Sequence, residues 1–197
     1  MVEVNEFRYC KERLRFLCPT LSESLIDDLS LGWRVVFFDK REHLIEANCI
    51  QENAFMIVQG LVRAYYPTLE EDITINFVAE GEFATHYTSL EHPRPSHFAF
   101  QALEPTTAVA FSYENVYEMS KRRHETEQLL RLLLEYEYNR LMAHTETLLL
   151  RNAEDRYRLF LKHFGHLMSR ISVTDLSGYL GISRQNLTLI RKRLLLV

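Results

Sequence analysis

The hydrophobic pattern of the chain changes character near residue 112. Between residues 33 and 111, short runs rich in β-branched and aromatic residues are separated by polar or turn residues, a pattern that predicts strands. We expect seven strands, over residues 33–38, 43–46, 54–58, 61–66, 73–77, 98–103 and 107–111. Gln59-Gly60 and Glu80-Gly81 predict tight turns. Strands this short and closely spaced predict an antiparallel barrel or sandwich.

Helical periodicity flanks this β region on both sides. Apolar residues recur at helical spacing between Leu21 and Leu31, behind Thr20 as the expected N-cap. After Ser112 the pattern predicts a short helix over 115–123 and a long one over 125–151, followed by a helix that starts after Asn152 and stops at Gly165. The chain is therefore expected to be of the α+β class.

The long helix carries an apolar stripe close to a heptad repeat. Its positions are Leu130, Leu134, Tyr138, Leu141, Thr145 and Leu148. Such a stripe often packs within one chain, but here a second apolar flank lies beside it (Leu129, Leu132, Leu133 and Met142). Because the two flanks exceed what one barrel face needs, we favour the stripe as the seam of a homodimer.

Residues 172–194 predict two helices joined by a tight turn. Val173 or Thr174 opens the first helix, Gly178 is small where the two helices are expected to cross, and Gly181 suits a turn with positive φ. Ser183 is the expected N-cap of the second helix. The expected inward side chains are Leu176, Tyr179, Leu180, Ile182, Leu187, Ile190 and Leu194.

The polar residues of this segment are candidates for contact with double-stranded DNA. Arginine can bond guanine and glutamine or asparagine can bond adenine in the major groove, while later basic residues suit phosphates. The DNA-binding candidates are Thr174, Ser183, Arg184, Gln185, Asn186, Thr188, Arg191 and Lys192. The alternative is an ordinary helical hairpin with a polar face.

Composition and charge support two modules. The 197 residues are 47% hydrophobic and 25% charged, as in globular proteins. Residues 1–150 carry 14 Lys and Arg against 24 Asp and Glu, whereas residues 151–197 carry 9 against 3, so the basic module faces the expected polyanion. No apolar run has the length of a membrane span, the N-terminus lacks the pattern of a signal peptide, and three cysteines are too few for a disulfide framework, so we expect a cytoplasmic protein.

This layout resembles bacterial transcription regulators of the Crp/Fnr type, most closely their Bacteroidetes-type branch. The specific marks are the stretches Phe55-Met-Ile-Val-Gln-Gly-Leu-Val-Arg-Ala-Tyr65, Glu80-Gly-Glu-Phe83 and Leu180-Gly-Ile-Ser-Arg-Gln-Asn-Leu187. The resemblance implies a jelly-roll-like, cyclic-nucleotide-binding-like β-roll over 1–122, a dimerisation helix over 123–151 and a helix-turn-helix over 152–197. It further implies a homodimer on DNA, and it leaves open a contact with RNA polymerase and a small-molecule effector of unknown identity.

Several positions depart from that family. Aligned without a gap from Gly81, the ribose and phosphate positions of the cyclic-nucleotide binders here read Thr85-His86-Tyr87 and Ser96-His97, so we expect no response to cAMP. The candidate effector residues are Arg94, Tyr87 and His97. Leu189 stands where the family commonly has arginine, and the residues after the second helix leave no room for a wing.

Neither a metal site nor catalysis is expected. Iron–sulfur members of the family need four cysteines, and His86, Glu91, His92 and His97 share a loop without the spacing of a common metal site. We therefore expect no cofactor. A ligand- or metal-binding barrel whose C-terminal helices only assemble the protein is the main alternative. A cupin-type enzyme would need paired histidines, and since His-x-His does not occur we expect no enzyme.

Overall fold

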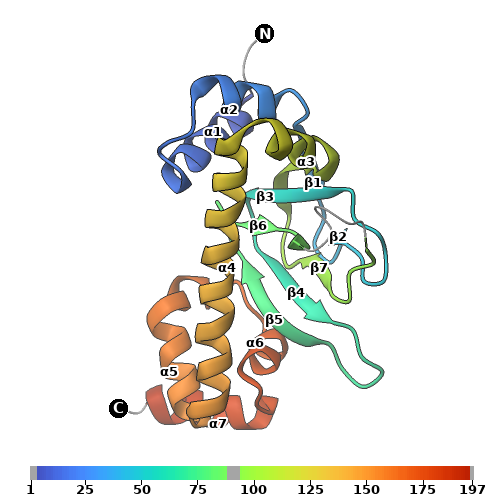
Figure 1. Cartoon of the computed structure of the whole chain (residues 1–197). Coiled ribbons are helices and arrows are strands. Elements are labelled where there is room, and N and C mark those ends of the chain that lie inside the picture. Colours follow the sequence, from blue (N-terminus) through green and yellow to red (C-terminus); the bar gives the residue numbers. More distant parts are fainter. Residues whose placement is uncertain (1–3, 88–93, 196–197) are drawn as a thin grey trace.

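The computed structural model describes residues 4–87 and 94–195. It contains a β-roll of two sheets, helices at the N-terminus, one long helix and a helical C-terminal module (Figure 1). The long helix runs from the N-terminal helices to the C-terminal module, alongside the β-roll. These features confirm the α+β class and the expected architecture.

The β-roll consists of two four-stranded antiparallel sheets. The strands are β1 (Arg34–Phe38), β2 (His43–Ile45), β3 (Asn53–Gln59), β4 (Val62–Tyr66), β5 (Ile73–Val78), β6 (Phe83–Ala84), β7 (Ala99–Ala102) and β8 (Thr106–Ser112). One sheet has the order β1-β8-β3-β6 and the other β2-β7-β4-β5. Each predicted strand is confirmed to within one residue at either end, and among the strands of the described residues only the two-residue β6 was not predicted.

Apolar side chains of both sheets meet in a common core. Phe38, Phe55, Ile57, Val62, Val78 and Phe100 are among its buried members. The predicted turns are also present, because Gly60 and Gly81 have φ of 114° and 80°, a region that glycine adopts without a steric penalty.

Two helices precede the roll and two follow it. These are α1 (Asn5–Leu17), α2 (Glu23–Ser30), α3 (Tyr113–Arg122) and α4 (His124–Leu150). Helix α1 was not predicted. The N-cap of α2 is Ser22, whose Oγ accepts from the backbone N of Leu25, so the prediction of Thr20 was wrong. The Thr20 hydroxyl instead donates to Gln128 Oε1 of α4 at 3.4 Å. The first turns of α4 pack on this N-terminal layer through buried Leu129 and Leu133.

The C-terminal module contains α5 (Ala153–Phe164), the short 3-10 helix η2 (Gly165–Leu167), α6 (Val173–Leu180) and α7 (Arg184–Leu195). Helix α5 starts after Asn152 as predicted, and Asn152 is its N-cap, with Oδ1 accepting from Asp155 N at 2.9 Å. Helix α5 ends before Gly165, but Gly165 keeps a right-handed φ of −56° and leads into η2 rather than reversing the chain.

The core of this module includes side chains from the β-roll. Leu61 and Phe77 are buried together with Tyr157, Phe160 and Leu176. The C-terminal helices are therefore packed on the roll in this structure. Among the described residues, none of the helices combines the length and apolar character needed to cross a membrane.

Candidate nucleic-acid interface

Helices α6 and α7 form the predicted helix-turn-helix. Ser172 Oγ caps α6 by accepting from Asp175 N at 3.0 Å, and Ser183 Oγ accepts from Asn186 N at 3.2 Å at the start of α7. Between the helices Gly181 has φ 62° and ψ 42°, the left-handed conformation that the sequence predicted. Buried Leu176, Leu187 and Ile190 join the two helices to α5.

Gly178 serves a different contact from the one expected. A methyl group at Gly178 would lie 3.3 Å from Thr74 N, in the first residues of β5, and 3.6 Å from the carbonyl oxygen of Asp72, the residue before β5. The prediction that Gly178 lies where the two helices cross closely is therefore wrong, because the segment that approaches Gly178 belongs to the β-roll and not to α7. Its small size lets α6 approach the backbone of the β-roll.

The DNA-binding candidates lie mainly on one outer surface. Arg184, Gln185, Asn186, Thr188 and Lys192 of α7 are exposed, as are Thr174 of α6 and Ser183 of the turn. Thr188 Oγ1 donates to the Arg184 carbonyl at 2.8 Å, which leaves its oxygen as an acceptor for an outside partner. Arg191 differs because it is half-buried, with its guanidinium 5.8 Å from the centre of the Tyr157 ring.

The surface around α7 is positively charged. Helix α7 contains no acidic residue, and the segment after residue 150 has only three. Glu154 pairs with Arg158 on α5 at 2.8 Å, and Asp175 pairs with Arg63 of the β-roll at 2.8 Å. Two of the three carboxylates are therefore paired with arginines, and few unpaired negative charges lie near the exposed basic side chains of α7. A surface with this excess of positive charge attracts a polyanion.

Two arginines fix the C-terminal module to the β-roll. Arg63 of β4 contacts both Asp175 and Asp72, and Arg170, just before α6, contacts Glu80 and Glu104 at 2.7 and 2.5 Å. Sequence reasoning missed both residues. A charged residue between the buried Val62 and Ala64 was the available signal for Arg63, whereas its partner lies 112 positions away.

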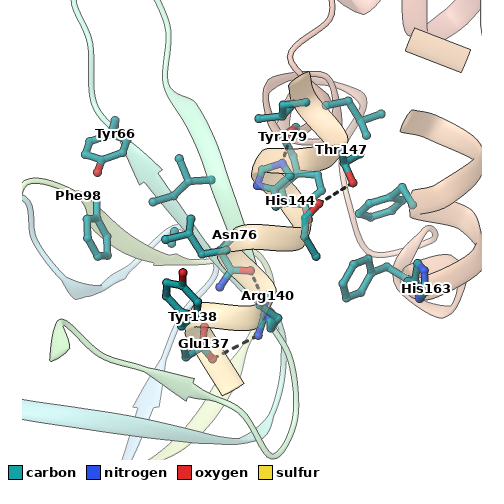
Figure 2. Close-up of a pocket in the computed structure, with 18 of the residues that line it drawn as sticks. Tyr66, Asn76, Phe98, Glu137, Tyr138, Arg140, His144, Thr147, His163 and Tyr179 are labelled. Atoms are coloured by element: carbon teal, nitrogen blue, oxygen red, sulfur yellow. Dashed lines mark hydrogen bonds and ion pairs between the residues drawn. The ribbon is translucent and has the colours of Figure 1, made fainter. Parts of the chain in front are cut away.

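The predicted seam on α4 is largely exposed in the single chain. Tyr138 and Leu141 are each 62% exposed, and Leu134, Thr145 and Leu148 are also exposed, whereas Leu130 is half-buried. On the adjoining face of α4, Arg140 donates to the Phe77 carbonyl of the roll and His144 bonds the Tyr179 carbonyl of the C-terminal module, while Glu137 pairs with Arg140 within the helix (Figure 2). An apolar row of this extent on a helix surface is typical of a protein–protein interface.

The candidate effector residues do not gather at one place. Tyr87 lines a cavity beside α4, whereas Arg94 and His97 are exposed and are not among the residues that line it. The neighbouring Thr85 and His86 are held by Tyr113, whose hydroxyl lies 2.7 Å from Thr85 Oγ1 and accepts from His86 N at 3.0 Å. Glu91 and His92 lie outside the described residues, and the described residues contain no group of three metal-ligating side chains.

Comparison with solved structures identifies the fold. FixK2 from Bradyrhizobium japonicum matches with a TM-score of 0.73 and 18% identity, over 82% of this chain and 84% of that chain. A structure from Eubacterium rectale assigned to the Crp/Fnr family of transcriptional regulators gives 0.74 and 14%, over 91% and 86%. The c-di-GMP responsive global regulator CLP of Xanthomonas campestris gives 0.71 and 14%, over 88% and 91%.

No protein-family model matches the chain, and no curated protein sequence matches it significantly. The likeness therefore consists of the arrangement of the β-roll, the long helix and the helix-turn-helix, at identities below 20% for the three structures named. The chain has the fold of Crp/Fnr-type regulators, as its sequence motifs predicted.

Proposed function

We propose that the chain is a DNA-binding transcription regulator that acts as a homodimer. The exposed polar row of α7 carries this proposal, because Arg184, Gln185 and Asn186 occupy the first turn of a helix that follows a left-handed glycine turn. In helix-turn-helix proteins this part of the second helix reaches base edges in the major groove. The neighbours' recorded role as regulators supports the same assignment.

Dimerisation through α4 would supply the second helix-turn-helix. The exposed stripe from Leu134 to Leu148 offers an apolar surface along the half of the helix nearest to the C-terminal module. A two-fold pair of helix-turn-helix modules binds half-sites about 34–36 Å apart, one turn of the duplex. The expected target is therefore a pseudo-palindrome with half-site centres about ten base pairs apart.

Selection from a random pool of duplex DNA tests this proposal. The purified chain is expected to enrich an inverted repeat, and its affinity for that repeat should fall steeply with salt because bound phosphates release counterions. A ligand-binding barrel whose C-terminal helices serve only assembly would instead show negligible, salt-insensitive affinity. If no sequence is enriched and the affinity for DNA is negligible and insensitive to salt, the proposal that the chain is a DNA-binding regulator is wrong.

A further inference from the structure

A groove of about 330 Å³ lies between the end of α2 and helix α3, in the N-terminal layer and at the opposite end of the molecule from the C-terminal module (Figure 1). Its walls come from α2, from residues 31–33, from the end of β8 and from α3. No described residue of α4 lines this groove, so it is separate from the cavity beside α4. Its volume is within the range of about 300–1,000 Å³ that is usual for small-molecule sites.

More than half of the side chains that line the groove are apolar. Leu29, Trp33 and Phe111 are buried, and Val116 and Met119 of α3 are half-buried. The rings of Trp33 and Phe111 lie with their centroids 4.8 Å apart and their planes at 56°. An apolar body in this groove would be removed from water on several sides, which is favourable by about 25 cal/mol for each Å² buried.

Trp33 is the only tryptophan of the chain, and its indole N–H lacks a partner. The Nε1 atom is buried and makes no hydrogen bond to any described residue, whereas the backbone N of Trp33 donates to the Ser30 carbonyl at 3.2 Å. An indole N–H is a donor only, so the partner that it lacks is an acceptor. Because buried polar groups usually have a partner, this N–H favours a ligand that brings an acceptor into the groove.

Two exposed side chains of the groove are free to move when a ligand enters. Leu31 is 86% exposed, and Asn115 is exposed beside Gly32, where an added methyl group would lie 2.5 Å from Asn115 Nδ2. Exposed side chains change rotamer within nanoseconds. The N–H of Trp33 is covered in this structure, so an acceptor reaches it only when a lining side chain moves, and Leu31 and Asn115 can do so at little cost in packing.

Charges of both signs surround the groove. Asp28 lies 3.3 Å from Arg123, and Glu118 lies 2.9 Å from Lys121 and 3.7 Å from Arg122. Each carboxylate therefore has a basic neighbour, and a charged ligand of either sign would meet a charge of its own sign. This arrangement favours an uncharged ligand.

We propose that the groove between α2 and α3 binds a small uncharged compound with a ring-sized apolar body and one carbonyl-type oxygen. The apolar body lies against Phe111, Val116 and Met119, and the oxygen accepts from the indole N–H of Trp33. Both contacts use groups that have no part in the helix-turn-helix. Binding in this groove therefore does not depend on the proposed function in DNA recognition.

Nuclear magnetic resonance of the ¹⁵N-labelled full chain tests this proposal, because a single tryptophan gives a single indole N–H signal. The probe is acetophenone, and the control is α-methylstyrene, in which a CH₂ group replaces the carbonyl oxygen. Acetophenone should shift the indole proton saturably downfield, and further downfield than α-methylstyrene does, because only the ketone offers an acceptor. Benzoate, which is charged, should bind more weakly than acetophenone. An unchanged indole signal, equal shifts from the two uncharged compounds, or tighter binding of benzoate would each overturn the proposal.

Two leucine variants test whether the ligand lies in this groove. Leu31→Ser removes an apolar side chain that lines it and should weaken the binding of acetophenone and of α-methylstyrene severalfold. Leu69→Ser makes the same change at a fully exposed leucine between β4 and β5, outside the groove, and should leave both affinities unchanged. Because both leucines are exposed, each variant is expected to fold. Equal affinities in the two variants would contradict the site between α2 and α3.

Discussion

Arg63 of the β-roll and Asp175 of the helix-turn-helix form an ion pair with Nη1 and Oδ1 2.8 Å apart. Their side chains are only 11% and 12% exposed, so the pair is shielded from solvent. Arg63 also binds Asp72 and Gln101, and Asp175 also accepts from Ser172. The pair thus joins the start of α6 to three points of the roll and holds the face of α6 that carries Gly178 against β5.

Loss of this shielded pair is expected to be costly. Asp175→Asn keeps the shape of the side chain but leaves Arg63 with one fewer charged partner, and should lower the free energy of unfolding by about 2 kcal/mol. Chemical denaturation measures the loss. Glu154→Gln is the matched control, because it removes an exposed pair with Arg158 and should cost no more than about 0.5 kcal/mol. If the two variants lose the same free energy of unfolding, the charged contact between Arg63 and Asp175 contributes no more to stability than an exposed ion pair.

The turn of the helix-turn-helix allows a second comparison between two glycines. Gly181→Ala places a Cβ at φ 62° and 3.2 Å from Arg156 Nη1, and should destabilise the chain by about 1–2 kcal/mol. Gly165→Ala has a right-handed φ and no atom within 4 Å of the added methyl, so it should be neutral or stabilise by up to about 1 kcal/mol. Thermal unfolding of both variants checks the sign of each effect, and a neutral Gly181→Ala would contradict the left-handed assignment.

The sequence predicted those elements whose signals are local. The run from Ala54 to Val58 is apolar and contains aromatic and β-branched residues, and a strand was found there at Asn53–Gln59. Gly181 specifies its turn because few other residues accept its positive φ. Helix α1 escaped prediction because only Cys10 and Leu14 are buried along its charged length and its N-cap, Val4, offers no capping side chain.

Long-range contacts set the limit of local prediction. The choice of Ser22 over Thr20 as a cap depends on Gln128 and Glu125, more than 100 positions later, which bind the two hydroxyls. The small side chain of Gly178 likewise led us to expect a close contact with the second helix of the helix-turn-helix, whereas the close contact is with the backbone at β5. The cavity beside α4 could not be predicted for the same reason, since residues from seven separate elements line it and no short motif predicts that these elements meet.

The exposed stripe on α4 predicts the effect of a charge placed within it. Leu141→Glu would bury an unpaired carboxylate in the proposed dimer interface and should weaken self-association at least about 100-fold. Leu31→Glu introduces the same charge at a leucine that is 86% exposed and follows α2, outside the α4 stripe, and should leave association unchanged. Sedimentation equilibrium compares them. A monomeric parent chain, or equal behaviour of the two variants, would exclude the α4 seam.

Two basic residues of α7 should affect DNA binding in different ways. Arg184→Ala removes a candidate base contact and should cost about 1–3 kcal/mol, with relaxed preference at one base pair. Lys192→Ala removes a candidate phosphate contact and should weaken binding to all sequences alike, with a salt slope lower by about one. Fluorescence anisotropy on the selected repeat and its single-base variants separates these outcomes. If Arg184→Ala leaves both affinity and preference intact, its assigned role is wrong.

His144 gives the contact between α4 and α6 a dependence on pH. Its Nε2 donates to the Tyr179 carbonyl at 3.0 Å, and the two rings stack with centroids 4.1 Å apart and planes 4° from parallel. Burial lowers the pKa of His144 and nearby Arg140 lowers it further, although the hydrogen bond to Tyr179 opposes both. The unfolded chain therefore takes up a proton here at a higher pH than the folded chain does.

The sign of the effect follows from this difference in proton binding. As the pH falls from about 6.5, the ordinary pKa of histidine, towards the lowered folded value, protons favour the unfolded chain and His144 contributes a loss of stability. His144→Gln keeps an N–H donor for Tyr179 but does not titrate, so its free energy of unfolding should fall less than that of the parent between pH 7.5 and 5.5. His124→Gln, at an exposed histidine of the same helix, should follow the parent. Because burial of His86 acts in the same direction and Glu137 in the opposite one, only the difference between parent and variant isolates His144. Parallel pH profiles for the parent and His144→Gln would show that His144 is not the group that titrates.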